Sequence, residues 1–189
     1  MFNAVRQRLR DAGTIKTLCL RAEAHANAEG HREPGAEHFV LAALDLPDST
    51  ARSALSTLGI TSDEFRMAIE QQYRSALAGI GLSIDGQAEF AADGAAVPAG
   101  QGPYRSQASA QKLMAVLTSE IMKAEHARDS AAPLLGAHVL LAASDASRGV
   151  CARAFESLQT TPAQVAAAAR QALETARDRA VQVGSASGR

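Results

Sequence analysis

The sequence predicts an all-α fold of about eight helices, arranged as two four-helix repeats related by pseudo-twofold symmetry. The first observation is an internal duplication, because a ten-residue stretch beginning at Gly35 returns in altered form at Leu135. The second is composition: alanine dominates the 47% of hydrophobic residues, aromatic residues make up 4%, and tryptophan is absent. Short side chains let helices pack closely, whereas sheets favour β-branched and aromatic residues. No segment shows a competing strand pattern.

The duplication extends beyond the first stretch at a constant offset of one hundred positions. The matched pairs are His38 with His138, Ala42-Ala43 with Ala142-Ala143, Leu58 with Leu158, Thr61 with Thr161, and Phe65 with Val165. A match over this length indicates that one helical unit was doubled. We therefore expect a single globule over residues 1–189, in which the two halves cover each other's apolar helices.

The first repeat is assigned to residues 3–78. Apolar periodicity and turn residues predict helices over about 3–29, 36–46, 50–58 and 62–78. Gly30 fits the end of the first helix, and the second is apolar on nearly all sides, which implies burial. Thr61 and Glu64 have the spacing of a capping box, in which each side chain bonds the other residue's backbone N–H.

Residues 79–103 form a predicted flexible linker, because six of the fourteen glycines lie there without sustained periodicity. The second repeat is assigned to residues 104–181, with helices over about 106–128, 134–145, 148–158 and from Thr161 onward. Thr161 and Gln164 repeat the capping box. Residues 182–189 are expected to be a disordered tail.

Charge and apolar runs exclude several classes of protein. Nineteen basic and twenty acidic residues give a formal charge of −1, without the basic excess typical of nucleic-acid binding. No run approaches the roughly 20 apolar residues that span a bilayer, and no signal-peptide pattern is present. Cys19 and Cys151 are isolated, as in a reduced compartment. We therefore expect a cytoplasmic protein that binds neither nucleic acid nor membrane.

No motif supports catalysis or a cofactor. The glycines at 30 and 35 have P-loop spacing, but Ala36 and Glu37 stand where that loop needs Lys and Ser or Thr. The glycine-rich stretch 79–85 begins like a dinucleotide site or a nucleophile elbow, yet lacks the glycines that complete either. The chain is therefore expected not to be an enzyme and to need no cofactor.

Five ionisable residues cluster in sequence around one loop: His25, His31, Glu33, Glu37 and His38. Two histidines and a carboxylate are a possible zinc set, but the HExxH helix pairing is missing. The favoured interpretation is that His38 and His138 begin buried helices and hydrogen-bond the preceding loop. On that interpretation no metal site is expected.

Glu37 allows two interpretations. A carboxylate at a helix N-terminus is favoured by the helix dipole, so it can simply stabilise the first turn. It can also receive a guanidinium or amine from a bound peptide. The second copy has Ala137 at this place, so such a site would be single. Glu37 and His38 are the candidate ligand- or peptide-binding residues.

These features resemble a known family. The motif Gly35-Ala36-Glu37-His38 before an apolar helix, the turn Leu58-Gly59-Ile60 and a capped helix resemble the N-terminal domain (Clp repeat) of Clp unfoldases, especially ClpC. The likeness spans about residues 10–178. It implies the same eight-helix fold. No Walker A motif or ATPase module follows, so we expect a free-standing N-domain.

The resemblance also implies a function. Such domains dock substrates and adaptors for an ATP-driven unfoldase and its protease; some ClpC domains receive phosphoarginine through motif carboxylates, and some bind cyclic-peptide antibiotics at a face built from the first helices of the repeats. By that match Glu37 is a candidate contact. We expect a binding module that modulates Clp proteolysis as adaptor or decoy. The alternative is a Clp-independent, holdase-like scavenger of unfolded or cyclic peptides.

Overall fold

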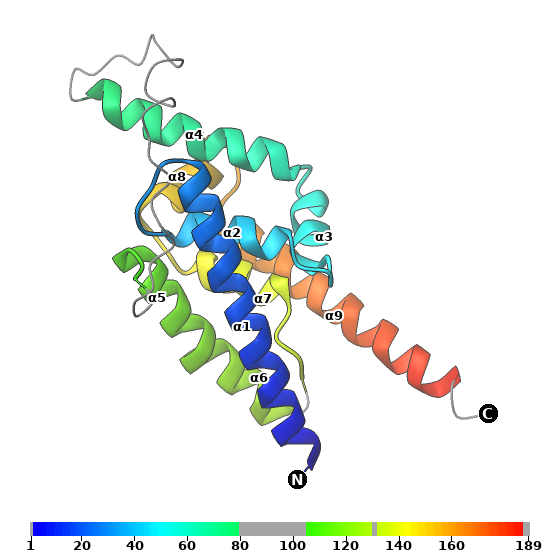
Figure 1. Ribbon diagram of the computed structural model, residues 1–189. Helices are drawn as coiled ribbons and strands as arrows, with labels where there is room; N and C mark the ends of the chain where they lie inside the picture. Colours follow the sequence, from blue (N-terminus) through cyan, green and yellow to red (C-terminus); the bar gives the residue numbers. More distant parts are fainter. Residues whose placement is uncertain (1, 80–104, 130–131, 187–189) are drawn as a thin grey trace.

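The computed structural model describes residues 2–79, 105–129 and 132–186, and all regular structure in these ranges is helical (Figure 1). The helices are α1 (Phe2–Ala28), α2 (Ala36–Leu44), α3 (Thr50–Thr57), α4 (Ser62–Gly79), α5 (Ala108–Val116), α6 (Met122–Arg128), α7 (Gly136–Ser144), α8 (Val150–Ser157) and α9 (Pro162–Ala186). A π-helical turn, Leu117–Ile121, joins α5 to α6 without a break. Counted as one, these segments leave eight helices in the described residues, which confirms the all-α prediction.

The helix boundaries repeat at the offset seen in the sequence. Helices α2, α3 and α4 begin at residues 36, 50 and 62, and α7, α8 and α9 begin at residues 136, 150 and 162. The predicted capping boxes explain part of this agreement. The Thr61 N–H donates to Glu64 at 2.7 Å and the Glu64 N–H donates back to Thr61 Oγ at 3.2 Å. Thr161 and Gln164 form the same pair of bonds at 2.8 and 3.3 Å.

Three predicted segments differ from the structure or lie outside the described residues. The predicted linker 79–103 falls almost wholly in residues 80–104, which lie outside the described residues. The prediction of a disordered tail from residue 182 was wrong at its start, because α9 continues to Ala186. The predicted helix 106–128 contains the π-helical turn, which apolar periodicity did not indicate. The Thr118 hydroxyl donates to the Met114 carbonyl at 2.8 Å, a bond that competes with the helix's own pattern there.

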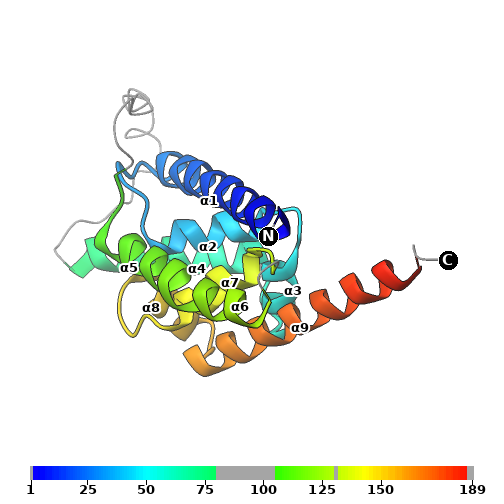
Figure 2. The ribbon, with the colours of Figure 1, turned by 90° about the horizontal axis from the view of Figure 1, so that it is seen from below.

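Helix α2 occupies the centre of the molecule. All nine of its residues are buried, as its uniformly apolar sequence predicted. Helix α7 packs beside it. Helix α1 packs on α2, and the continuous α5–α6 helix packs on both α2 and α7 (Figure 2). The core therefore lies around the two copies of the duplicated motif.

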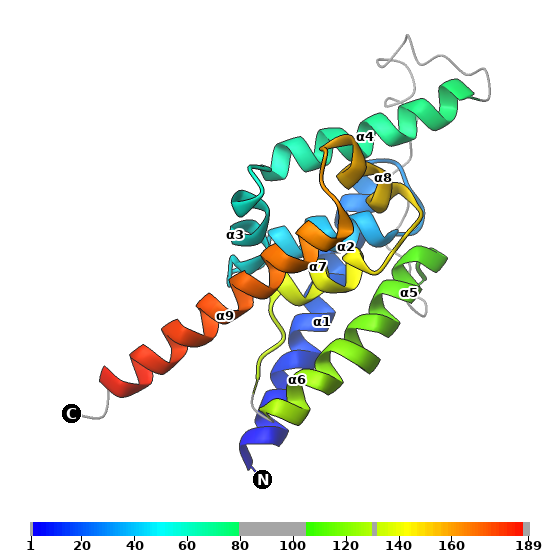
Figure 3. The same cartoon turned by 180° about the vertical axis from the view of Figure 1, so that it is seen from behind.

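The remaining helices cross from one half to the other. Helix α3 packs against α9 and α4 packs against α8, where the rings of Phe65 and Phe155 lie 4.8 Å apart (Figure 3). Exchanging the halves exchanges these two contacts, as a twofold relation between repeats predicts. The C-terminal part of α9 extends beyond the other helices. None of the helices in the described ranges combines the length and apolarity needed to cross a bilayer.

The first turn of α7 is capped by residues of the other half. Asp48 accepts from the Gly136 N–H at 3.2 Å and the Thr50 hydroxyl accepts from the Ala137 N–H at 2.9 Å. A Cβ on Gly136 would lie 2.9 Å from the Ala43 carbonyl oxygen, so glycine allows this close approach. The first N–H groups of α7 are thus hydrogen-bonded by the loop before α3 and by the first residue of α3.

Candidate functional site at the start of helix α2

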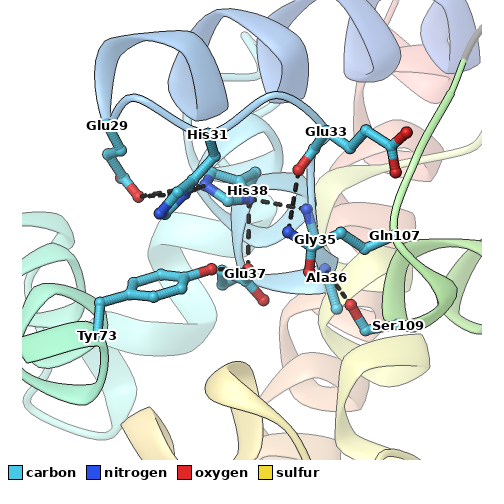
Figure 4. Close-up of polar contacts among 10 residues, drawn as sticks. All are labelled: Glu29, His31, Glu33, Gly35, Ala36, Glu37, His38, Tyr73, Gln107 and Ser109. Carbon is cyan, nitrogen blue, oxygen red and sulfur yellow. Dashed lines mark hydrogen bonds and ion pairs between the residues drawn. The ribbon is translucent and has the colours of Figure 1, made fainter. Parts of the chain in front are cut away.

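The loop between α1 and α2 begins with a glycine turn and is hydrogen-bonded to residues at the start of the second half. Gly30 adopts φ +76°, a conformation that costs glycine little, and reverses the chain after α1. The Gln107 N–H donates to the Pro34 carbonyl at 3.0 Å, and the Ser109 hydroxyl accepts from the Ala36 N–H at 3.2 Å (Figure 4). The start of the second half therefore fixes the loop that presents the motif.

His38 has the structural role predicted for it. Its side chain is fully buried, and Nδ1 accepts a 2.8 Å bond from the Gly35 N–H. His138 accepts an equivalent 3.0 Å bond from the Leu135 N–H. Burial, opposed only partly by the nearby Glu125, lowers the pKa of His138 to about 4. Both histidines thus tie a loop to a buried helix start.

Glu37 lies in the first turn of α2, as predicted, but it is almost fully buried at 1% exposure. The Tyr73 hydroxyl donates to its Oε1 at 2.6 Å, while the rest of the carboxyl group turns away from Tyr73 (Figure 4). Burial and this bond raise the pKa of Tyr73. His38 Nδ1 lies 3.4 Å from the same Oε1. No Lys or Arg forms an ion pair with Glu37 among the described residues.

Gly35 leaves room for the Glu37 side chain in its present position. A Cβ at residue 35 would lie 2.2 Å from Glu37 Oε1 and 2.7 Å from its Cδ. The carboxyl group therefore folds back over the glycine that precedes the helix. Glycine and glutamate in the motif are linked by this packing.

The ionisable cluster predicted around this loop is only partly assembled. Glu29, His31 and His38 come together, with Glu29 Oε2 3.1 Å and His31 Nδ1 3.2 Å from His38 Nε2. His25 instead pairs with Asp45 at 2.8 Å. Glu33 contributes its backbone carbonyl oxygen and not its carboxylate: that oxygen accepts a 3.0 Å hydrogen bond from the Gln107 side chain.

Glu29 was missed by the sequence analysis, because only the left-handed turn at Gly30 brings it to His38. Burial alone would raise the pKa of Glu29, but the hydrogen bond from His38 and the nearby histidines lower it overall. Burial and His38 lower the pKa of His31. At neutral pH Glu29 is therefore a carboxylate and His31 a neutral imidazole.

A cavity of about 230 Å³ opens beside the start of α2. Ala36 and Glu37 line it from the first half, and α5, α7 and the loop before α8 line it from the second; its charged lining residues are Glu37, Lys112, Asp145 and Arg148. Lys112 and Asp145 lie 3.9 Å apart and are both largely exposed. Cys151 also lines it, and burial raises the pKa of its thiol, which disfavours a reactive thiolate. We call this cavity the α2 pocket.

A second, more open cavity of about 470 Å³ lies between α1 and the α5–α6 helix. Arg8, Asp11 and Ile15 line it from α1, and Met122 and His126 line it from the opposite side. Asp11 Oδ2 is 3.2 Å from His126 Nε2, and Asp11 Oδ1 accepts from the Leu134 N–H at 2.9 Å. This second pocket lies between the first helices of the two halves.

Residues 15–87 match a family model described as the Clp repeat (R) N-terminal domain. This part of the chain is similar to a Clp repeat domain. The match spans α1 from Ile15 onward through α4, and so includes Glu37 and His38. The Clp repeat family comprises non-catalytic substrate-binding domains. The resemblance inferred from the motif is confirmed for these residues, and no curated protein matches the chain.

The Clp repeat match ends before the second copy of the motif. That copy has Leu135, Gly136 and Ala137 where the first has Gly35, Ala36 and Glu37. Its assignment as a second Clp repeat, and the nearer likeness to ClpC, stay predictions from the sequence.

Proposed function

We propose that this chain is a non-enzymatic binding module that modulates Clp-dependent proteolysis, docking peptide segments of substrates or adaptors in the α2 pocket. The Clp repeat match supports a Clp-related binding module. The observation that carries the finer proposal is the position of Glu37, which lines the pocket and has no Lys or Arg partner among the described residues. A buried carboxylate is stabilised when a cation reaches it.

The pocket suits one side chain with a cationic end. Its walls are mainly apolar and fit the methylene stem of Arg or Lys, which commonly packs on apolar surface. The carboxyl group of Glu37 then receives the guanidinium or ammonium group. Arg148 and Lys112 at the pocket can meet an acidic group of the same ligand, so a phosphoarginine side chain is among the ligands to test.

The matching place in the other half, the start of α7, lacks the carboxylate that Glu37 supplies to the α2 pocket. Ala137 replaces Glu37 there, and Asp48 and Thr50 bond the first N–H groups of α7. We therefore propose that one cationic side chain binds per chain. Cyclic peptides, implied by the resemblance to ClpC, are assigned in this proposal to the second pocket between α1 and the α5–α6 helix.

A degradation assay tests the proposal. A Clp unfoldase–protease pair and a fluorescent substrate are incubated with increasing amounts of the chain. A decoy slows degradation and an adaptor accelerates it, and either change should be lost in Glu37→Gln but kept in Glu70→Gln, a substitution on the exposed face of α4. Unchanged degradation, together with no Clp component recovered on the chain in a native pulldown, would refute a Clp-directed function.

An aggregation assay on the same protein samples distinguishes the Clp-independent scavenger from the Clp-directed binding module. A holdase-like scavenger would suppress aggregation of an unfolded client protein when no Clp component is present. Suppression without any effect on degradation would favour the scavenger and replace the first proposal.

A further inference from the structure

Three ligand-type atoms converge beside the α2 helix. Glu29 Oε2, His31 Nδ1 and His38 Nε2 all lie within 4.8 Å of one another, and their separations are 3.1, 3.2 and 3.8 Å. They come from the turn directly after α1, the loop that follows it and the first turn of α2 (Figure 4). The three atoms form a small triangle of two nitrogens and one oxygen.

We propose that Glu29, His31 and His38 bind one divalent transition-metal ion of the zinc type. A tetrahedral zinc with bonds of about 2.0–2.1 Å holds its ligand atoms roughly 3.3–3.4 Å apart, and the three separations bracket that value. Two imidazoles and a carboxylate are a zinc ligand set. This replaces the expectation of no metal site, which considered Glu33 and Glu37 and missed Glu29.

The second half shows that the histidine cap does not need the other two residues. His138 accepts from the Leu135 N–H as His38 does from Gly35, yet its buried Nε2 has no hydrogen-bond partner in the described residues. Glu29 and His31 are therefore additions around Nε2 of His38 alone. Capping does not account for them, whereas binding of an ion at Nε2 would.

An ion can reach the cluster from solvent. The side chains of Glu29 and His31 are 18% and 25% exposed, while that of His38 is fully buried. His38 thus forms the inner ligand and the other two form the outer ones. Three protein ligands leave a fourth position of a tetrahedral ion, which can take a water molecule.

Binding requires a rearrangement at His38. Because Nδ1 accepts from the Gly35 N–H, the neutral ring carries its proton on Nε2, where it is donated to Glu29. The ion takes the place of that proton, which moves to Nδ1. Glu37 Oε1, 3.4 Å from Nδ1, then accepts it, as carboxylates commonly do behind metal-bound histidine. The Gly35 N–H loses its partner, so its hydrogen exchange should become faster when metal is bound.

Cobalt titration of the chelator-treated, tag-free full chain is the test. Co²⁺ in a tetrahedral site gives visible d–d absorption, and zinc should displace it at one ion per chain. His31→Ala and Glu29→Gln remove outer, partly exposed ligands and should each weaken binding by about tenfold or more, in line with the sensitivity of metal sites to their surroundings. His25→Ala, which changes a histidine of α1 that pairs with Asp45, should bind as the wild type does.

Circular dichroism of each variant establishes that it is folded. Absence of cobalt absorption and of zinc binding heat in the folded wild type would overturn the proposal. So would unchanged binding in both His31→Ala and Glu29→Gln, because the ion would then bind elsewhere. The titration is carried out without peptide, so its outcome does not depend on the proposed peptide site.

Discussion

The Tyr73 hydroxyl donates a 2.6 Å hydrogen bond to Oε1 of Glu37, joining the C-terminal half of α4 to the first turn of α2. Glu37 is 1% exposed, so this bond satisfies a carboxyl oxygen that water hardly reaches. The contact spans 36 residues of sequence. It fixes the orientation of the residue on which the proposed function depends.

Tyr73→Phe should therefore destabilise the fold. Removing a donor from a buried acceptor costs about 1–3 kcal/mol in the free energy of unfolding. Urea denaturation followed by circular dichroism measures the loss. In a Glu37→Gln background the same substitution should cost less, because an amide is cheaper to leave without this donor. Equal costs in both backgrounds would show that the two side chains are not coupled.

Gly35→Ala should also lower the free energy of unfolding. The new Cβ would lie 2.2 Å from Glu37 Oε1, so the carboxyl group must leave its position and its bond to Tyr73. Gly13→Ala is the matched control, because nothing lies within 4 Å of a Cβ there and alanine favours a helix interior by about 0.5–1 kcal/mol. Opposite shifts in the urea midpoint are expected. A neutral or stabilising Gly35→Ala would contradict the position assigned to Glu37.

His138 should make the fold sensitive to acid. Its folded-state pKa of about 4 lies below the ordinary value of 6.5, so the unfolded chain binds the proton more readily. Stability is fully present above pH 6.5 and falls as the pH drops towards 4, by on the order of 3 kcal/mol for a shift of this size. His138→Gln keeps an acceptor for the Leu135 N–H and should flatten this slope. Urea midpoints measured across this range test it; an equally steep slope in the variant would assign the acid sensitivity to other groups.

The sequence was most informative where partners lie close together along the chain. The boxes at Thr61 and Thr161 and the loop bond of His38 join residues three positions apart, and all were predicted correctly. Their residue types specify the geometry directly, because the helix start fixes which backbone groups need partners.

The parts that the sequence did not predict depend on distant contacts or on backbone conformation. Tyr73 and Glu37 are 36 positions apart, and Asp48 reaches Gly136 across 88. Glu29 joins the histidines only because Gly30 turns the chain with a positive φ. Neither the pocket nor the three-residue cluster leaves a periodic pattern. The cluster predicted from the sequence therefore included His25, which pairs with Asp45, and omitted Glu29.

The proposed function depends most on Glu37 as a receptor for a guanidinium or ammonium group. The most direct measurement is fluorescence anisotropy with a labelled peptide containing arginine, its phosphoarginine form, and the same peptide with uncharged citrulline. A charge-assisted bond is worth about 1.5–3 kcal/mol, so the wild type should bind the arginine or the phosphoarginine peptide at least about tenfold more tightly than the citrulline peptide. Glu37→Gln should abolish this preference and Glu70→Gln should keep it. Equal affinity of the wild type for all three peptides, or a preference that survives Glu37→Gln, would contradict the account.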